Sequence, residues 1–389
     1  MRNFSILTRA FAVLLCCLGT LQASLAQDAP AFESQAKHAI LIDAKSGIIF
    51  YEKDANTAVP PASMSKLMTQ VIVFDALKKR TLKIDQTFVV SENAWRKGGS
   101  LARGSTMYAE LNSKVSIDNL LHGAIIQSAN DACIAIAEGM AGSELGFSLL
   151  MDRKAKQLGM TNSSFANSTG LPDPKQRMSV ADLARVARYI VNIHPDYFKI
   201  YSQPEFTWNK ITQANRNPLL KDYPGADGMK TGYTKEAGYG MVGSATRDGR
   251  RLIMVVAGLT SIAERKLEAQ KLLDWGFNQF KTIELYDAGE TVARARVWGG
   301  ESRWVNLASP NRVQLALSTA EQAKVDVRMS YTGPLIAPVK AGTPVGVVRV
   351  LIDGKAISEV QLVTDRDIAA VDSMWQRAYD SALIMLFGS

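Results

Sequence analysis

Apolar runs that come in pairs, each pair separated by a short polar turn, predict β-hairpins near both ends of the first 285 residues. The four runs are residues 39–42, 48–51, 239–245 and 252–259. The second turn contains Asp248-Gly249, a dipeptide that favours the tight turns of hairpins. Because the segment between the hairpins is mostly helical in pattern, we expect one sheet built from strands at both ends. The helices would pack on that sheet or form a lobe of their own.

Helical spacing of apolar residues dominates the segment between the two hairpins. The predicted helices begin near Ser63, Ile117, Ala132 and Val180, and a further helix over 263–280 follows the second hairpin. Ser179 and Asp182 have the spacing of a capping box at the start of the helix over 180–191. The polar stretch 91–104 interrupts the helical pattern and is either a surface loop or the border of a site.

A period of two, with large apolar residues at every second position, marks the region after residue 285 as a different kind of structure. The alternating segments are residues 293–297, 313–317 and 325–329, and a hairpin pairs 348–352 with 356–362 across Asp353-Gly354. A period of two is typical of half-buried strands. We therefore expect a small β-sandwich or barrel over 286–365, and we find no cluster of catalytic residue types in it.

The last segment, residues 366–389, is helical in pattern and ends in the apolar run 382–387. It is too short to span a bilayer, but an amphipathic helix of this kind can lie in a membrane interface. Its few charges include Asp367, Asp372 and Asp380, so its electrostatic attraction to anionic lipid is weak. Docking of this helix on the protein itself is the alternative, and the pattern leaves both open.

Residues 1–26 have the features of a secretory signal peptide. Arg2 and Arg9 occur without acidic residues, an apolar stretch follows, and residues 24–26 form a small-residue cleavage site. The apolar stretch is short for an uncleaved membrane anchor. We therefore expect export and a mature chain that starts near Gln27.

Composition adds a mild basic excess and one remaining cysteine. The net charge is +8, with 47% hydrophobic and 21% charged residues, which is ordinary for a globular protein. The basic residues are scattered and are not interleaved with aromatic ones, so we expect no nucleic-acid partner. Cys16 and Cys17 fall in the signal peptide, which leaves Cys133 as a packed thiol in an apolar helix. The expected domains are 27–285 and 286–365, followed by the tail.

Ser63 and Lys66 are the first candidates for chemistry. A helical spacing of three residues puts both side chains on one face, so the Lys66 amine can reach the Ser63 hydroxyl. A serine becomes a nucleophile when a base takes its proton, and a lysine is such a base when burial or a nearby cation lowers its pKa. The same spacing occurs by chance at Ser34 and Lys37, which lie in no predicted helix.

Two further motifs follow Ser63 in the chain. Ser128 and Asn130 form an SxN motif between two predicted helices, and residues 230–232 are the only KTG sequence, expected at the start of a strand. Neither motif is specific alone, since SxN also occurs over 91–93. The order SxxK, SxN, KTG on a helix start, an inter-helix loop and a strand argues against a chance coincidence.

With these three motifs the chain resembles the serine penicillin-recognising family, and more narrowly the low-molecular-mass penicillin-binding proteins with D-alanyl-D-alanine carboxypeptidase activity. Supporting stretches are residues 168–172, 215–217 and 228–233. The resemblance covers nearly the whole chain. It implies an α/β (α+β) domain of the serine β-lactamase and D,D-peptidase type, followed by a small all-β domain and an amphipathic helix. It also implies a penicillin-sensitive enzyme that removes the terminal D-alanine from peptidoglycan pentapeptides.

The resemblance assigns roles to the motif residues. Ser63 attacks the peptide bond between the two terminal D-alanines and forms an acyl-enzyme, and Lys66 accepts its proton. Ser128 and Lys230 relay that proton to the departing D-alanine. Asn130 positions the substrate backbone.

The resemblance also implies a binding side to the site, whose residues are Lys230, Thr231, Gly232, Tyr233 and Arg265. The backbone N–H groups of Ser63 and Tyr233 would form an oxyanion hole. Thr231 and Arg265 would hold the terminal carboxylate, for which a forked guanidinium is suited. Relatives often have histidine where this chain has Tyr233, which leaves substrate discrimination and acyl-enzyme lifetime open.

Three other functions remain open from the sequence. A β-lactamase shares the motifs, but Glu110, in a stretch similar to the β-lactamase signature, precedes the SxN motif instead of following it. A D,D-endopeptidase is closer, although such relatives usually lack a β-rich region. A non-catalytic penicillin sensor would be acylated at Ser63 without turning over peptide.

The sequence carries no signature of a metal or cofactor. His38, His122 and His194 are the only histidines, and no HExxH, GxSxG or glycine-rich phosphate loop occurs. The expected ligands are stem peptides ending in D-Ala-D-Ala and β-lactams, with a membrane surface as partner of the tail. By resemblance, the expected location is the periplasm at the outer face of the inner membrane.

Overall fold

The computed structural model describes residues 32–387. The signal-peptide prediction over 1–26, with Cys16 and Cys17, lies outside the described residues. Every helix and strand below lies in one compact unit that begins at Ser34. Its first region, up to about residue 279, and the β-rich region that follows are described separately.

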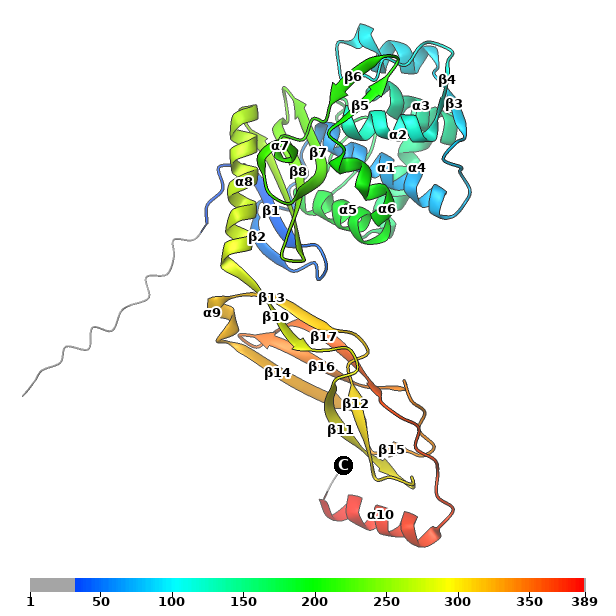
Figure 1. Ribbon diagram of the computed structural model, residues 1–389, viewed down its shortest axis with the longest axis vertical. Helices are drawn as coiled ribbons and strands as arrows, with labels where there is room; N and C mark the ends of the chain where they lie inside the picture. Colours follow the sequence, from blue (N-terminus) through cyan, green and yellow to red (C-terminus); the bar gives the residue numbers. More distant parts are fainter. Residues whose placement is uncertain (1–31, 388–389) are drawn as a thin grey trace, which may run out of the picture. The chain divides into compact units, whose positions relative to one another are not determined.

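A single five-stranded antiparallel sheet forms the centre of the first region, in the order β2-β1-β9-β8-β7 (Figure 1). Its strands are β1 (His38–Asp43), β2 (Ile49–Lys53), β7 (Ala226–Thr234), β8 (Gly238–Arg247) and β9 (Arg250–Leu259). Strands from both ends of the region pair directly, since β1 lies next to β9. The two predicted hairpins therefore belong to one sheet, and β7 is left at its edge.

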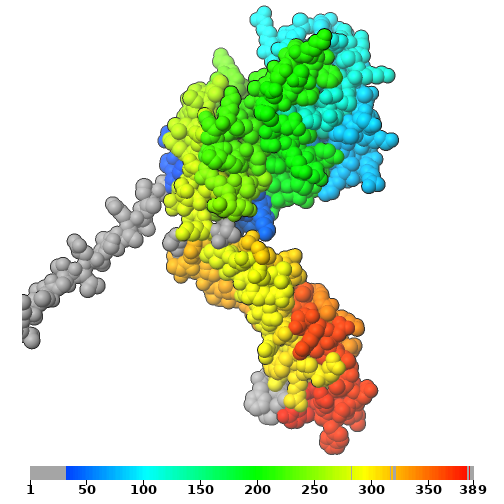
Figure 2. Space-filling model, viewed as in Figure 1, coloured from blue at the N-terminus to red at the C-terminus, as the bar shows by residue number. Residues whose placement is uncertain are grey.

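Six longer helices surround this sheet or form a lobe beside it. They are α1 (Lys66–Lys78), α2 (Ile117–Ile126), α3 (Asn130–Ala141), α4 (Glu144–Gln157), α5 (Val180–Ile193) and α8 (Ile262–Gln279). α8 packs on β8 and β9, α5 packs on β1 and β9, and α1 packs on α5 and on the helical lobe. Segments that are far apart in the sequence therefore lie next to one another at the surface of this region, as the cyan, green and yellow-green parts of Figure 2 show.

Short elements connect these helices and strands. They are η1 (Ala62–Ser65), β3 (Thr87–Val89), a π-helical turn (Ala94–Gly98), a 3-10 turn (Ser100–Ala102), β4 (Lys114–Ser116), α6 (Pro195–Phe198), a 3-10 turn (Lys199–Ser202), β5 (Glu205–Trp208), β6 (Ile211–Ala214) and α7 (Leu219–Asp222). The expected capping box of α5 is half formed. Ser179 Oγ accepts from the Asp182 N–H, but the Asp182 carboxylate accepts from Asn162 and Ser163 instead.

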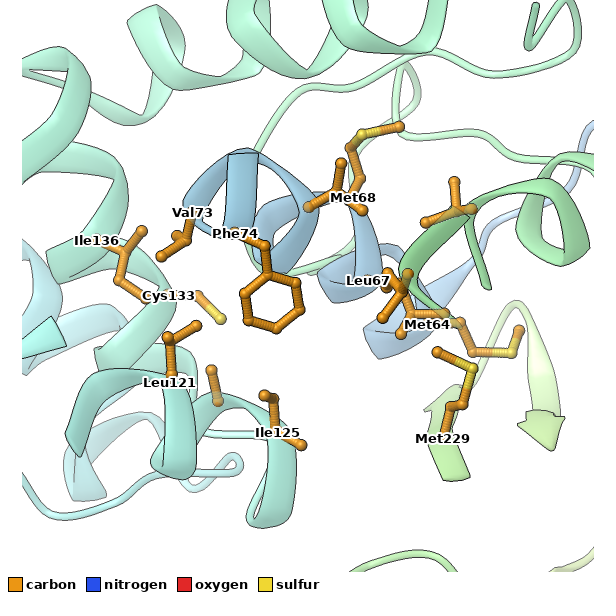
Figure 3. Close-up of a cluster of buried hydrophobic side chains, with 14 of the residues drawn as sticks. Met64, Leu67, Met68, Val73, Phe74, Leu121, Ile125, Cys133, Ile136 and Met229 are labelled. Carbon is orange, nitrogen blue, oxygen red and sulfur yellow. The ribbon is translucent and has the colours of Figure 1, made fainter. Parts of the chain in front are cut away.

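The core is continuous from the sheet into the helical lobe because α1 is buried over most of its surface, and Lys78 is its one exposed residue. A helix buried to this extent lies inside the protein and not on its surface. Phe74 extends from α1 toward Ile125 of α2 and Cys133 of α3, as Figure 3 shows. Cys133 is fully buried, and burial raises the pKa of its thiol to about 11. It is therefore a packed thiol, as the apolar pattern around it predicts.

The β-rich region contains a six-stranded sheet in the order β14-β16-β17-β12-β11-β15 and a two-stranded sheet β10-β13. The strands are β10 (Phe280–Tyr286), β11 (Thr291–Trp298), β12 (Trp304–Ala308), β13 (Val313–Ser318), β14 (Val325–Tyr331), β15 (Leu335–Ile336), β16 (Pro344–Ile352) and β17 (Lys355–Thr364), with the short helix α9 (Thr319–Gln322) after β13. Leu315 and Leu317 of β13 pack with Val350 of β16, so the two sheets share a core. The expected domain boundary after residue 285 falls inside β10, whose pairing with β13 joins residues 280–285 to this region.

The tail forms helix α10 (Met374–Phe387), which contacts the β-rich region through one face. The Asp380 carboxylate is buried and accepts from the Gly299 N–H and from Arg303. Met374 and Trp375 are more than 80% exposed. Within residues 32–387 no single helix has the length and composition needed to cross a membrane; α3 and α4 pass that test only as a pair, which is bent by 84°.

Candidate active site

Ser63 lies in the 3-10 turn η1, which leads directly into α1. A helix therefore begins near Ser63, as expected, but its first turn is a 3-10 turn and the α-helix itself starts at Lys66. The tighter 3-10 turn keeps Ser63 just outside the helical ladder. The spacing of three residues still aligns the two side chains, and Lys66 Nζ lies 2.8 Å from Ser63 Oγ.

Two glycines let neighbouring segments approach this turn closely. A Cβ at Gly232 of β7 would lie 3.1 Å from the Cβ of Ala62, and a Cβ at Gly170 would lie 1.9 Å from the Ala62 carbonyl oxygen. A side chain at either position would push the strand or the loop away from Ser63. Because these two positions lack a side chain, strand β7 and the loop over 168–172 can pack directly against the turn that carries Ser63.

The Lys66 amine is fully buried and lies within hydrogen-bond distance of three oxygens. Besides Ser63 Oγ, these are Asn130 Oδ1 at 2.7 Å and the Thr169 carbonyl at 2.6 Å. Burial, with a smaller contribution from the positive charge of Arg216, lowers the pKa of Lys66 to about 8. An amine with this pKa is substantially neutral in mildly basic solution and can accept a proton.

Ser128 and Lys230 form a second hydroxyl–amine pair. Lys230 Nζ donates to Ser128 Oγ at 2.8 Å and to the Thr231 carbonyl at 2.9 Å. Ser128 lies in the loop between α2 and α3 with φ 63°, and Asn130 begins α3. Burial, and then the charge of Lys66, hold the pKa of Lys230 well below its usual value. The KTG motif lies in the middle of β7, which corrects the expectation that it starts the strand.

A cleft of about 640 Å³ opens beside these two pairs. The expected site residues that line it are Ser63, Ser128, Thr231, Gly232, Tyr233 and Arg265. Lys66, Asn130 and Lys230 are almost completely buried and reach the lining hydroxyls directly or through one another. The structure thus brings all nine expected residues to one place. Lining residues without an expected role are Ser105, Asn215, Arg216, Pro218, Lys221, Tyr239, Ile262 and Lys266.

The cleft is lined by positive charge. Arg216, Lys221, Arg265 and Lys266 contribute to its walls, and none of the lining residues described in the structure is acidic. A cleft of this kind attracts an anionic ligand such as a free carboxylate. Arg216 belongs to the stretch 215–217 that supports the family resemblance, and that stretch was the one signal in the sequence that could have pointed to it.

Arg265 is only 7% exposed, and its Nε is buried without a hydrogen-bond partner. Its guanidinium lies 5.7 Å from the centre of the Tyr239 ring. Tyr239 in turn stacks on Tyr233, with ring centres 4.2 Å apart. Burial lowers the pKa of Arg265 from its usual value, but an arginine remains charged in proteins.

Other residues considered from the sequence lie elsewhere. Ser34 donates to Glu268 and lies in no helix, so it is a chance match to the serine motif. Glu110 is exposed and lies outside the lining of the cleft. Buried His194 pairs with Asp75 at 2.8 Å. Among residues 32–387, no group of three or more His, Cys, Asp and Glu side chains could hold a metal ion.

Comparison with known protein families identifies two segments. Residues 23–261 match the family described as D-alanyl-D-alanine carboxypeptidase, peptidase S11. Residues 280–370 match the family described as the C-terminal domain of penicillin-binding protein 5. The second match covers most of the β-rich region, whose first strand also begins at residue 280.

Individual proteins resemble the chain over most of its length. The D-alanyl-D-alanine carboxypeptidase DacC of Escherichia coli is 37% identical, covering 88% of this chain and 86% of that protein. The carboxypeptidase DacA of Haemophilus influenzae is 36% identical, covering 85% and 84%. Among solved structures, penicillin binding protein 5 from Haemophilus influenzae matches with a TM-score of 0.79 and 35% identity, covering 88% of this chain and 99% of that one.

Proposed function

The chain belongs to the D-alanyl-D-alanine carboxypeptidase family, and from this premise we propose how its own residues carry out the reaction. It is a serine-type carboxypeptidase that acts on peptidoglycan peptides ending in D-Ala-D-Ala and binds β-lactams. The observation that carries the residue assignment is the contact of Ser63 Oγ with the buried amine of Lys66 at 2.8 Å. We assign Ser63 as the nucleophile and Lys66 as its base.

The three oxygens around Lys66 fit a neutral amine. Such an amine has two N–H donors and one lone pair. The donors are directed to Asn130 Oδ1 and to the Thr169 carbonyl, which leaves the lone pair for the proton of the Ser63 hydroxyl. The Ser63 oxygen then bonds to the carbonyl carbon between the two terminal D-alanines while Lys66 takes its proton.

The second pair serves the leaving group. Ser128 is hydrogen-bonded to Lys230 and lines the same cleft. With Lys230 it relays to the nitrogen of the departing D-alanine the proton that Lys66 took from Ser63, so Ser128 gives up its own proton and regains one as the carbon–nitrogen bond breaks. The backbone N–H groups of Ser63 and Tyr233 stabilise the negative charge that develops on the carbonyl oxygen. Water afterwards hydrolyses the ester at Ser63 and frees the shortened peptide.

Arg265 and Thr231 hold the terminal carboxylate of the peptide. Within residues 32–387 Arg265 forms no ion pair with an acidic side chain, and its buried Nε lacks a hydrogen-bond partner. A carboxylate bound in the cleft supplies the missing acceptor, and charge-assisted hydrogen bonds are about twice as strong as neutral ones. Free C-terminal carboxylates are therefore preferred over amides.

The pKa of Lys66 predicts how acylation depends on pH. Because burial lowers this pKa to about 8, the ammonium form dominates below that pH and cannot accept the Ser63 proton. The rate of acylation by a β-lactam should rise about tenfold per pH unit from about pH 6 and level off above about pH 8. Stopped-flow acylation rates across this range test it, and a rate that is flat or falls with rising pH contradicts the base assignment.

A covalent adduct locates the nucleophile. Intact protein treated with penicillin should gain the mass of one antibiotic molecule, and peptide mapping should place it on Ser63. Ser63→Ala should gain no mass, whereas Ser34→Ala, which removes the chance match to the motif, should be labelled like the unmodified chain. An adduct on any other serine would contradict the assignment.

We also propose that the chain is exported to the periplasm and lies at the outer face of the inner membrane. The signal-like segment 1–26 supports export. Helix α10 supports contact with a membrane surface, because its buried Asp380 docks it on the β-rich region while Met374, Trp375 and Met385 are exposed. Aromatic and apolar side chains on one face of a helix are the groups that enter a lipid interface.

Removal of the tail tests that contact. A chain ending at Asp365 should leave the membrane fraction while it keeps its rate of acylation by penicillin, since α10 lies outside the cleft. Trp375→Ser should weaken membrane partitioning, and Ser381→Ala, which alters a docking contact with Trp298, serves as the matched control. Unchanged partitioning of the shortened chain would show that α10 is only a docked helix.

A further inference from the structure

We propose that Tyr239 is a positioning residue whose ring holds the Arg265 guanidinium at the cleft, and that stacking on Tyr233 supports the ring. The structure thereby assigns recognition of the substrate's free carboxylate to a stack of three side chains. This inference rests on the proposed function and deepens it. No role of this kind follows from the three sequence motifs, because Tyr239 belongs to none of them.

The stack begins with a cross-strand pair. Tyr233 of β7 and Tyr239 of β8 are directly opposite each other in the antiparallel register, so their side chains emerge on the same face of the sheet. Their rings are stacked, with centres 4.2 Å apart and planes inclined by 29°. Tyr233 therefore packs against the Tyr239 ring and supports it.

Arg265 lies over the Tyr239 ring as well. It comes from the first turn of α8, which packs on β8, and its guanidinium carbon is 5.7 Å from the centre of the Tyr239 ring. A cation at this distance from a ring face is attracted to it, and the attraction grows when the pair is removed from water. Arg265 is 7% exposed, so the pair is largely removed from water.

A ring suits this task better than a carboxylate would. A buried arginine is usually paired with an acidic side chain, but a partner of that kind would compete with the substrate's carboxylate. An aromatic face attracts the guanidinium without neutralising its charge or accepting its N–H groups in the plane. The unpartnered Nε of Arg265 agrees with this, because it shows that the guanidinium is not held by another acceptor through this atom.

The backbone on both sides fixes the direction of the Tyr239 ring. A Cβ at Gly238 would lie 2.7 Å from the Leu259 carbonyl oxygen, and one at Gly240 would lie 2.6 Å from Met64 Cε. Gly238 also has φ 68°, a conformation that favours glycine. The strand carrying Tyr239 is therefore pressed against its neighbours, so the ring has a fixed base from which to orient Arg265.

The test compares substrates that differ only in the group Arg265 is proposed to hold. Tyr239→Leu removes the ring and should raise KM for a peptide ending in a free D-Ala-D-Ala carboxylate about tenfold. It should change KM for the C-terminal amide less than about twofold. Tyr239→Phe keeps the ring and should recover most of the loss.

Two controls separate positioning from a general structural effect. In an Arg265→Ala background, Tyr239→Leu should cause no further loss on the carboxylate substrate, because the group it positions is gone. Tyr223→Leu removes a ring that lies 4.7 Å from Arg247 outside the cleft, and it should leave the ratio of carboxylate to amide KM unchanged. Equal losses on both substrates, or additive losses in the double variant, would overturn the proposal.

A second pair of substrates shows whether the positioning role of Tyr239 or the carboxypeptidase assignment has failed. Penicillin carries a free carboxylate and its methyl ester does not, and acylation by either needs no D-alanine release. If the unmodified chain is acylated but releases no D-alanine, the carboxypeptidase assignment fails while the positioning proposal is still tested by the acylation rates. Tyr239→Leu should then slow acylation by penicillin about tenfold more than acylation by the ester; equal slowing overturns the proposal.

Discussion

Replacing Lys66 with alanine is expected to slow acylation of Ser63 by penicillin by about 10²- to 10⁴-fold, the contribution of a positioned general base. The Lys66 amine lies 2.8 Å from Ser63 Oγ. Among the described residues it is the one basic group within hydrogen-bond distance of that oxygen. Without it the hydroxyl keeps its proton and remains a weak nucleophile. The measurement is the second-order rate constant of acylation, followed by the gain in protein mass.

Loss of folding must be separated from loss of the base. Lys66→Ala also removes donors from the buried Asn130 amide oxygen and the Thr169 carbonyl, which costs about 1–3 kcal/mol for each unpaired group. Lys154→Ala is the matched control, because Lys154 pairs with Asp75 outside the cleft. It should lower the melting temperature and keep the acylation rate. If Lys66→Ala is acylated at the normal rate, Lys66 is not the base.

Replacing Arg265 with alanine is the second large effect, and it should depend on the substrate. For peptides with a free terminal carboxylate, kcat/KM should fall about 100-fold, which corresponds to about 3 kcal/mol for a charge-assisted interaction. For the matching amides the fall should be below about fivefold, because an amide offers no charge to the guanidinium. The measurement is D-alanine or D-alanine amide release over a range of peptide concentrations.

A control variant at another arginine shows whether the loss on carboxylate peptides is specific to Arg265. Arg251 lies on β9, outside the cleft. It pairs with Asp227, and its guanidinium lies over the ring of Phe198. Arg251→Ala should therefore affect stability and leave the preference for carboxylates over amides intact. An equal loss on both substrates in Arg265→Ala would contradict the carboxylate role.

Helices, strands and turns that form through a local pattern of residues were predictable from the sequence. Alternation and tight turns indicated the two hairpins that supply four strands of the five-stranded sheet, and they indicated β11, β13, β14, β16 and β17 of the β-rich region. They did not indicate β10, β12 or β15. Expecting that sheet to join both ends of the first region was correct, since β1 pairs with β9. The contact of Lys66 with Ser63 also follows from local spacing, because three residues of a helical turn bring the two side chains to one face.

Features that depend on tertiary packing were not predictable. The 3-10 geometry at Ser63 arises where Gly232 and Gly170 press two distant segments against the turn. The half-formed cap of α5 arises because the Asp182 carboxylate finds donors in a neighbouring loop. Sequence spacing describes contacts within an element, whereas these contacts join segments more than fifteen residues apart in the chain.

The binding side of the site shows the same limit. Arg265 could be assigned to the substrate carboxylate only through the family resemblance, because no spacing relates it to the motifs. Its placement over Tyr239 and the lining role of Arg216 emerged from the structure. The stacking of Tyr233 on Tyr239 also emerged from the structure alone.

Release of D-alanine from a purified pentapeptide muropeptide tests the central claim most directly. The chain beginning at Gln27 should release one D-alanine per peptide, and Ser63→Ala should release none while it retains the melting temperature of the unmodified chain. That result would establish the carboxypeptidase activity and its nucleophile together. Release that persists in Ser63→Ala would contradict the nucleophile, and a penicillin-labelled chain that releases no D-alanine would contradict the carboxypeptidase.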